Sequence, residues 1–241
     1  MSLLYPGSNY VLDGVHHCIP STERVIGPPV KWNAKKQEFF TKLKQLLAHF
    51  HETCTAAGIP YYISCGTLLG AVKMKGFLPS DTDADVCVLQ EDIPRLKEAF
   101  ANTPFILTPF RYGLKLAVHE FPHYPFLDIM PVALLPSHLN PNSEPTYSFS
   151  YPLDRNQQPT FELRLFFNKK KHPARLIFPL RKYEFEGMEL WGPAKGTEVC
   201  YLNYGENCLR QSFTKICRKH CISGFTAVWG YRLWEMIGGK K

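Results

Sequence analysis

Between residues 33 and 57, apolar residues recur at helical spacing, with basic and other polar residues at the positions between them. The apolar positions recur every three or four residues, and lysines fill most of the opposite face. Such a pattern is typical of an amphipathic helix that packs its apolar stripe on a core. Gly58 follows directly, and glycine readily adopts the left-handed backbone that ends many helices. We therefore predict a helix over residues 33–57, with these apolar positions facing inward: Phe39, Phe40, Leu43, Leu46, Leu47 and Phe50.

Shorter apolar runs, separated by glycine and proline, follow this helix. Their composition predicts strands over residues 61–65, 81–89, 105–107, 114–119 and 125–131, a short apolar segment over 175–180, and a hairpin over 185–191 with Gly187 near its turn. Helices are predicted over 68–75 with Thr67 as N-cap, over 92–101, and over 196–204 with Gly205 as the stop. Residues 136–160, rich in Pro, Asn and Ser, are expected to form a loop. Because strands and helices alternate early and become irregular later, the fold class is α/β or α+β.

The chain has 241 residues, of which 45% are hydrophobic, and this size suits one large domain. Residues 1–32 are rich in proline, glycine and polar residues, so we expect an extended N-terminal arm followed by a single domain over 33–241. No run approaches the roughly 18 consecutive apolar residues of a transmembrane helix. The first residues also lack the basic start and apolar run of a signal peptide. The location stays open between the cytoplasm and a secretory-pathway lumen reached through a missing targeting segment.

The net charge of +7 is unevenly distributed, with seven Lys or Arg and no Asp or Glu between residues 164 and 182. This stretch is either a solvated basic surface or a region that attracts a phosphate-bearing substrate. Nucleic acid is not expected as a partner, because no nucleic-acid-binding module is recognisable. The eight cysteines are scattered and favour reduced thiols. A disulfide stays open as an alternative, as does a zinc site formed by Cys200, Cys208, Cys217 and Cys221 with His220.

Three aspartates occupy alternate positions, namely Asp81, Asp83 and Asp85. In a strand, alternate side chains point to the same face, so these carboxylates repel one another and raise their pKa values unless a cation lies between them. Mg²⁺ and Mn²⁺ prefer carboxylate oxygens and also bind phosphate oxygens. Asp128, the one acid within the apolar run 125–131, is costly to bury without a partner and is the expected third ligand.

The Gly66-Thr67 pair precedes these acids at a predicted strand-to-helix turn. The first backbone N–H groups of a helix have no intrahelical acceptors and bind phosphate well, and glycine lets a ligand approach closely. Lys73 and Lys115 are candidates for phosphate contacts, with ordinary surface lysines as the alternative. A helix start, two acids on the next strand and a third acid on another strand together indicate a nucleotidyltransferase-type site.

Residues 66–86, GTLLGAVKMKGFLPSDTDADV, closely resemble the signature of the LicD/fukutin family, which includes the fukutin-related protein. Residues 127–131 resemble the family's Asp-Ile-Phe-Pro block, and residues 178–205 resemble its C-terminal block, so the resemblance extends over residues 35–210. The chain departs from the signature where Lys73 stands for arginine, Ser80 for tryptophan, Thr82 for aspartate and Ala84 for isoleucine. The changes at Ser80 and Thr82 leave the acids in place and bear on the choice of donor.

The resemblance implies a nucleotidyltransferase-like fold, in which helices flank a mixed sheet and the C-terminal part is irregular, and a dependence on Mg²⁺ or Mn²⁺. It implies transfer of a phospho-alcohol, such as phosphocholine or ribitol phosphate, from a CDP-linked donor to a glycan or glycoprotein acceptor. By motif position, the catalytic metal ligands are Asp83, Asp85 and Asp128, and Asp81 supports the metal site. The residues assigned to substrate binding are Gly66, Thr67, Lys73, Lys115 and Arg181.

Two other functions stay open for these acids. One is a glycosyltransferase whose Asp-x-Asp motif holds Mn²⁺ against a sugar nucleotide, and the other is an inactive binding protein that keeps the fold. Residues 119–123 spell the His-Glu-x-x-His pattern of zinc proteases, but Pro122 opposes the helix that this pattern needs, so we expect a solvent-facing loop. The acid run also resembles the start of a calcium-binding loop, but Val86 stands where that loop needs glycine.

Overall fold

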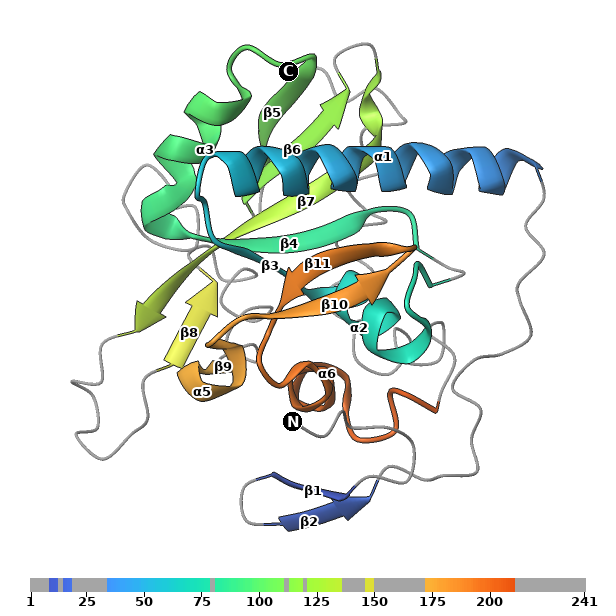
Figure 1. Cartoon of the computed structure of the whole chain (residues 1–241), viewed down its shortest axis with the longest axis vertical. Coiled ribbons are helices and arrows are strands. Elements are labelled where there is room, and N and C mark those ends of the chain that lie inside the picture. Colours follow the sequence, from blue (N-terminus) through green and yellow to red (C-terminus); the bar gives the residue numbers. More distant parts are fainter. Residues whose placement is uncertain are drawn as a thin grey trace, which may run out of the picture.

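The computed structural model describes residues 9–12, 15–18, 34–78, 81–110, 113–118, 121–135, 146–149 and 172–210. Its central sheet has the strand order β3-β4-β7-β6-β5 (Figure 1). β4 and β7 run parallel, whereas the other neighbouring strands in this order run antiparallel. The predicted mixed α/β fold is therefore confirmed. The strands are β3 (Tyr61–Ile63), β4 (Ala84–Leu89), β5 (Phe105–Phe110), β6 (Gly113–Val118) and β7 (Phe121–Leu135).

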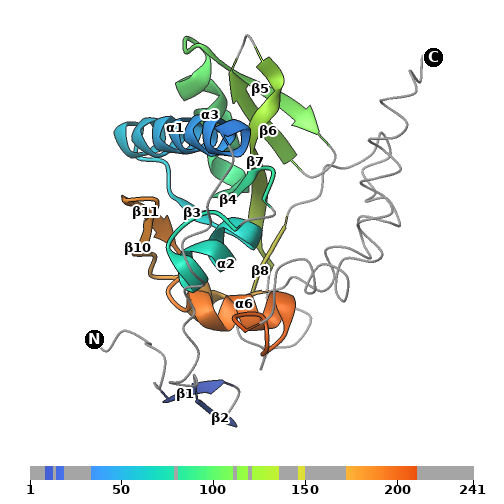
Figure 2. The same cartoon turned by 90° about the vertical axis from the view of Figure 1, so that its right-hand side faces the viewer.

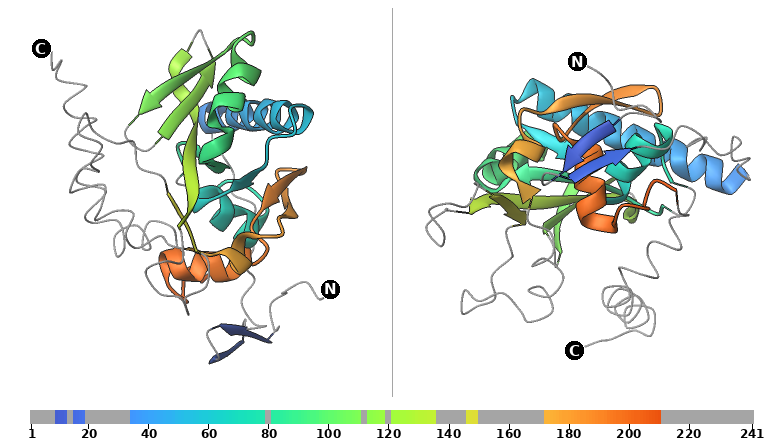
Figure 3. Two further views of the ribbon diagram at one scale, coloured as in Figure 1. Left: turned by 90° about the vertical axis from the view of Figure 1, so that its left-hand side faces the viewer. Right: turned by 90° about the horizontal axis from the view of Figure 1, so that it is seen from below.

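In the described part of the chain, two helices cover one face of this sheet, and three further helices lie beside it, below the sheet in the view of Figure 1. α1 (Ala34–Ala56) and α3 (Ile93–Phe100), which follows a 3-10 turn at Gln90–Asp92, pack on the same face (Figure 2, Figure 3). α2 (Cys65–Met74) packs against β4 and against α6 (Gly196–Tyr204), and the short α5 (Ala174–Ile177) lies beside α6. The helix predicted over 33–57 is confirmed, because its apolar stripe is buried and Gly58, with φ +62°, follows its end.

Two short strands extend the sheet along the C-terminal part of β7. β8 (Thr146–Phe149) pairs with β7, and β9 (His172–Pro173) pairs with β8. β8 falls within residues 136–160, so the loop prediction is wrong for these four residues. The reason is that β7 continues past the predicted end at residue 131 and offers its backbone to a partner strand. The remainder of that stretch lies outside the described residues.

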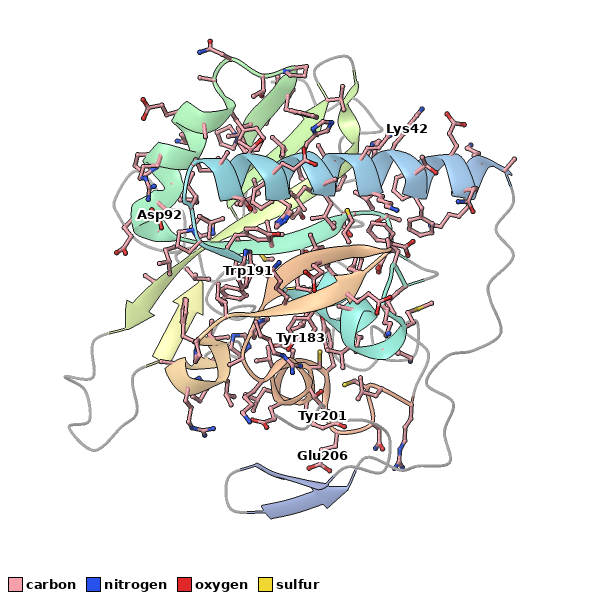
Figure 4. All side chains as sticks on the ribbon, in the orientation of Figure 1. Lys42, Asp92, Tyr183, Trp191, Tyr201 and Glu206 are labelled. Carbon is pink, nitrogen blue, oxygen red and sulfur yellow. The ribbon has the colours of Figure 1, made fainter. Side chains whose placement is uncertain are left out.

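The predicted hairpin and its turn are confirmed as β10 (Arg181–Phe185) and β11 (Met188–Gly192), although the first strand begins at Arg181, before the predicted start at residue 185. Glu186 and Gly187 have φ of +51° and +76°, which is the backbone of a two-residue turn that suits the twist of the flanking strands. Tyr183 lies between this hairpin and α6 (Figure 4). Its hydroxyl donates to the Pro193 carbonyl at 2.7 Å and accepts the Gly196 N–H at 2.9 Å, so it fixes the start of α6.

The start of α2 differs from the prediction. The helix begins at Cys65 with Ser64 as its N-cap residue, so Thr67 lies inside the first turn and does not cap the helix. The Thr67 hydroxyl instead accepts the backbone N–H of Asp85 at 2.8 Å. A contact between residues this far apart leaves no trace in local spacing, which explains why the N-cap was misplaced.

The acid-bearing strand is also shorter than predicted. β4 begins at Ala84, so Asp81 and Asp83 precede the strand and only Asp85 belongs to it. The cause is a local turn, because Leu78 and Asp81 exchange hydrogen bonds: the Leu78 N–H donates to Oδ2 of Asp81, and the Asp81 N–H donates to the Leu78 carbonyl, both at 2.9 Å. The three acids therefore do not alternate along one strand.

β7 begins before the predicted start at residue 125. Residues 121–123, which belong to the His-Glu-x-x-His pattern, are part of this strand, whereas residues 119 and 120 lie outside the described residues. The pattern needs a helix to place both histidines on one face, so a zinc-protease site does not fit this segment. The expected loop is replaced by strand over residues 121–123.

Part of the N-terminal region and of the cysteine set is also described. Within residues 1–32, where we expected an extended arm, β1 (Asn9–Leu12) and β2 (Val15–Cys18) pair as an antiparallel hairpin. Cys200 and Cys208 are buried thiols, but the rest of the suggested zinc set and residues 164–171 of the basic stretch lie outside the described part. No helix in the described part of the chain has the length and hydropathy to cross a bilayer.

Candidate active site

Three of the predicted site residues form one row across three strands. The strand register pairs Asp85 of β4 with Asp128 of β7, and Asp128 with Lys115 of β6. Side chains of paired residues project on the same face of a sheet, with neighbouring strands about 4.8 Å apart. The Lys115 ammonium donates to Oδ1 of Asp128 at 2.7 Å and lies 3.4 Å from the centre of the Phe126 ring. Two acids and a lysine from distant parts of the sequence are thus brought together.

The start of α2 holds Asp85 in place. The Gly66 N–H donates to Oδ2 of Asp85 at 3.1 Å, and the Asp85 N–H donates to the Thr67 hydroxyl at 2.8 Å. The Ser64 N–H donates to the Asp85 carbonyl at 3.0 Å. These three hydrogen bonds fix the side chain and the backbone of Asp85 at the start of α2. The Gly66 N–H, which we expected to face a phosphate, binds this carboxylate in the structure.

Asp81 also lies beside Gly66. A methyl group placed on Gly66 would lie 3.4 Å from Oδ1 of Asp81 and 3.5 Å from Oδ2 of Asp85, so both carboxylates lie next to the position that a side chain would occupy here. Asp81 is only 5% exposed. Its backbone carbonyl accepts the Lys36 ammonium of α1 at 2.8 Å. Lys36 belongs to none of the sequence motifs, and no spacing pattern identifies it as a neighbour of the acids.

The charge of Asp83 acts on the carboxyl groups of both Asp81 and Asp128. Burial raises the pKa of Asp128 to about 7, and the charge of Lys115 lowers it while the charge of Asp83 raises it further. Burial likewise raises the pKa of Asp81 to about 8, where the Leu78 N–H acts against the shift and the charge of Asp83 adds to it. Asp83 therefore lies near enough to both carboxyls to act on them. In both cases burial is the larger cause of the raised pKa, and the charge of Asp83 adds to it.

Carboxylate oxygens are the kind of ligand that a hard divalent cation prefers. Within the part of the chain that the structure describes, no group of three or more His, Cys, Asp or Glu side chains is arranged so that it could hold a metal ion by itself. Mg²⁺ does not require one, because it usually binds through one or two carboxylates, several waters and the phosphates of a substrate. Asp83, Asp85 and Asp128 offer oxygens only, which suit Mg²⁺ or Mn²⁺ better than zinc.

Lys73 and Arg181 have other described neighbours. Lys73 lies in the last turn of α2, at the end opposite Gly66, and its charge lowers the pKa of Cys208 against the larger effect of burial. The Arg181 guanidinium lies 4.3 Å from the Tyr183 ring, and its Nε is buried without a hydrogen-bond partner among the described residues. Their assignment to substrate binding stays a prediction.

The free energy of unfolding at different pH values tests whether burial raises the pKa of Asp81. Because its folded pKa of about 8 lies far above the ordinary value of 3.8, the native state holds a proton that the unfolded state loses. Stability therefore falls as pH rises from about 4 to about 8. Asp81→Asn keeps an acceptor for the Leu78 N–H and cannot ionise. We expect its gain in unfolding free energy over the wild type, measured by urea denaturation with EDTA, to be smaller at pH 5 than at pH 8. A gain of equal size at every pH would contradict the assignment.

The sequence predicted two acids on the strand after the helix start, whereas the structure places one acid on each of the adjacent parallel strands β4 and β7, beside the start of α2. Comparison with known proteins identifies the family. The sequence model described as LicD/FKTN/FKRP, nucleotidyltransferase domain, matches residues 58–195, which is more than half of the chain. The chain belongs to this family, and the resemblance found in the sequence is confirmed.

Individual relatives match over limited lengths. The uncharacterized protein RP689 of Rickettsia prowazekii (strain Madrid E) is 28% identical over 152 residues, which are 63% of this chain and 50% of the relative. The lipopolysaccharide cholinephosphotransferase LicD of Haemophilus influenzae is 36% identical over 72 residues, which are 30% of this chain and 26% of that protein. The chain thus spans half, or less, of the length of these curated relatives.

Solved structures show more distant likeness. ANT(2")-Ia in complex with adenylyl-2"-tobramycin aligns with a TM-score of 0.43 and 11% identity, over 80% of this chain and 92% of that chain. The lincosamide antibiotic adenylyltransferase LnuA, lincomycin-bound, aligns with a TM-score of 0.40 and 10% identity, over 70% of this chain and 96% of that chain.

Proposed function

We propose that this protein is a metal-dependent phosphotransferase, which moves a phospho-alcohol of the phosphocholine or ribitol phosphate type from a CDP-linked donor to a glycan or glycoprotein acceptor. The observation that carries the proposal is the side-by-side register of Asp85 and Asp128, with Lys115 bound to Asp128. Family membership supports a transferase, and the relative from Haemophilus influenzae is named a cholinephosphotransferase.

Asp83, Asp85 and Asp128 are the residues that would hold Mg²⁺ or Mn²⁺. When bound, the ion would neutralise the negative charge that develops on the phosphate during transfer. The chain fixes the ligand geometry beforehand, because Gly66 and Thr67 hold the carboxylate and backbone of Asp85. Such a fixed arrangement needs little reorganisation when the donor binds.

Asp128 is also suited to accept a proton. In the proposed reaction the acceptor hydroxyl attacks the donor phosphorus next to the alcohol, a new P–O bond forms, and the bond to CMP breaks. The hydroxyl proton passes to Asp128, a mostly buried carboxyl in the same row as Asp85. Lys115, 2.7 Å from Oδ1 of Asp128, holds this carboxyl in orientation and offers a positive charge for the incoming phosphate oxygens.

A donor panel tests the proposal. The full chain is incubated with CDP-choline, CDP-ribitol, CDP-glycerol, UDP-sugars and GDP-sugars, each with Mg²⁺ or with EDTA and with a mixed glycan acceptor. We expect CMP release from at least one CDP-alcohol, only in the presence of the metal, and a matching mass increase of the acceptor by mass spectrometry. Release of UDP or GDP would instead identify the Asp-x-Asp glycosyltransferase. No nucleotide release from any donor, together with equal Mg²⁺ and nucleotide affinity in the wild type and in Asp85→Asn, would identify an inactive binding protein.

A further inference from the structure

The loop between α2 and β4 is held from two sides by elements that are distant in the sequence. This loop carries Asp81 and Asp83, and the first turn of α1 and the turn of the β10–β11 hairpin lie on the same side of the molecule (Figure 1). From the hairpin turn, the Glu186 N–H donates to the Lys75 carbonyl at 2.8 Å, and the Glu186 carboxylate accepts the Phe77 N–H at 3.1 Å. These contacts fix the beginning of the loop.

The end of the loop, next to the acids, is held by α1. The Lys36 ammonium donates to the backbone carbonyl of Asp81 at 2.8 Å, across 45 positions in the sequence. A carbonyl directly before residues 82 and 83 thus has a charged donor, and hydrogen bonds to charged groups are stronger than neutral ones. α1 lies N-terminal to residues 58–195, so the family match assigns it no role.

Aromatic rings give Lys36 a defined position. Its ammonium lies 4.4 Å from the centre of the Phe40 ring and 5.2 Å from that of Phe39. Phe40 stacks on Phe77 of the same loop with centroids 5.0 Å apart, and Phe77 contacts Phe185 edge-on at 4.8 Å. A lysine on an aromatic face gains further cation–π attraction, so the ammonium is restrained before any ligand binds. The same packed cluster therefore links α1, the loop and the hairpin.

We propose that Lys36 is a positioning residue for the acids, which holds the Asp81 carbonyl so that Asp83 is directed towards Asp85 and Asp128. For its effect on metal binding, the inference rests on the proposed function. The inference gives α1, which lies outside the matched family domain, a role in positioning the acids in addition to its packing on the sheet.

Hydrogen exchange of the metal-free full chain tests the positioning directly. The Asp81 amide is bonded to the Leu78 carbonyl at 2.9 Å and reports on the order of the loop. We expect Lys36→Met to speed its exchange by about tenfold, the effect of losing a charge-assisted hydrogen bond, while amides in the middle of α1 keep their rates. Lys35→Met removes a neighbouring exposed lysine of the same helix and should leave the Asp81 rate unchanged. Lys36→Arg retains a charged donor and should restore most of the protection.

Mn²⁺ affinity, measured by water-proton relaxation, is the second measurement. We expect Lys36→Met to weaken binding by about 10-fold or more, as residues that orient metal ligands do, and Lys35→Met to bind as the wild type does. Equal Asp81 exchange in Lys36→Met and Lys35→Met would overturn the inference. If Lys36→Met does not fold, Lys36→Leu, which also removes the donor, takes its place under the same criterion. Wild-type protein that neither binds Mn²⁺ nor releases CMP would refute the proposed function, whereas the exchange result would still decide the role of Lys36.

Discussion

Asp85→Asn is expected to lower CMP release from the CDP-alcohol donor by more than about 100-fold, because mutation of residues that merely orient metal ligands already costs about 10- to 100-fold. The amide retains an oxygen that can accept the Gly66 N–H, so the contact that anchors the side chain at the start of α2 can survive. The change removes the charge of a proposed metal ligand and little else. Initial rates of CMP release at saturating Mg²⁺, together with Mn²⁺ affinity, measure the loss.

Stability separates a functional role of Asp85 from a structural one. Removing one of several clustered carboxylates relieves repulsion, so we expect the thermal midpoint of Asp85→Asn in EDTA to equal or exceed that of the wild type. Glu189→Gln, the same change on an exposed carboxylate of β11 that pairs with Lys182, should alter neither activity nor stability appreciably. A large drop in the thermal midpoint of Asp85→Asn without metal would mean that this acid serves the fold.

Gly70→Ala is expected to destabilise the protein by about 1–3 kcal/mol, the usual cost of forcing an extra group into a packed core. The chain turns back at Lys75, with φ +58°, and the Gly76 N–H donates to the Gly70 carbonyl at 3.4 Å. The carbonyl oxygen of Gly76 then lies directly over Gly70, where a methyl group would overlap it. This obstacle is backbone and cannot rotate away, so it outweighs the gain of about 1 kcal/mol that alanine brings to a helix interior.

Gly66→Ala provides the matched control in the same helix. Its methyl group would meet Asp81 and Asp85 at 3.4 and 3.5 Å, which are ordinary contact distances. We expect its unfolding free energy, from urea denaturation, to equal or exceed that of the wild type, even if the added methyl group beside the two carboxylates disturbs activity. Equal stability of Gly70→Ala and the wild type would show that the turn at Gly76 can move and that the close approach is not required.

Local patterns in the sequence predicted much of the fold. The amphipathic stripe of α1, the hairpin turn at Glu186 and Gly187, and α6 with its stop at Gly205 all depend on residues a few positions apart. The family signature was likewise recognisable, because it is a contiguous string of residues. Asp128 stood out because a single acid in an apolar strand has to find a partner.

The boundaries around the acids were less predictable. The exchange of hydrogen bonds between Leu78 and Asp81 delays the start of β4, and the contact of Thr67 with Asp85 places this threonine inside α2. Composition in both segments is compatible with a longer strand and a later helix. The energies that decide between these possibilities come from hydrogen bonds with partners that a local window does not contain.

By itself, the sequence determined the residue types of the site, the family and the main helices, because these are encoded in local spacing and in a contiguous motif. Only the tertiary structure decided that Asp85, Asp128 and Lys115 share one row and that Lys36 reaches the acid-bearing loop. Strand register and packing between distant elements set these neighbours. A shift of a single residue in the pairing of β4 with β7 would turn Asp128 away from Asp85, although every residue in the chain would be the same.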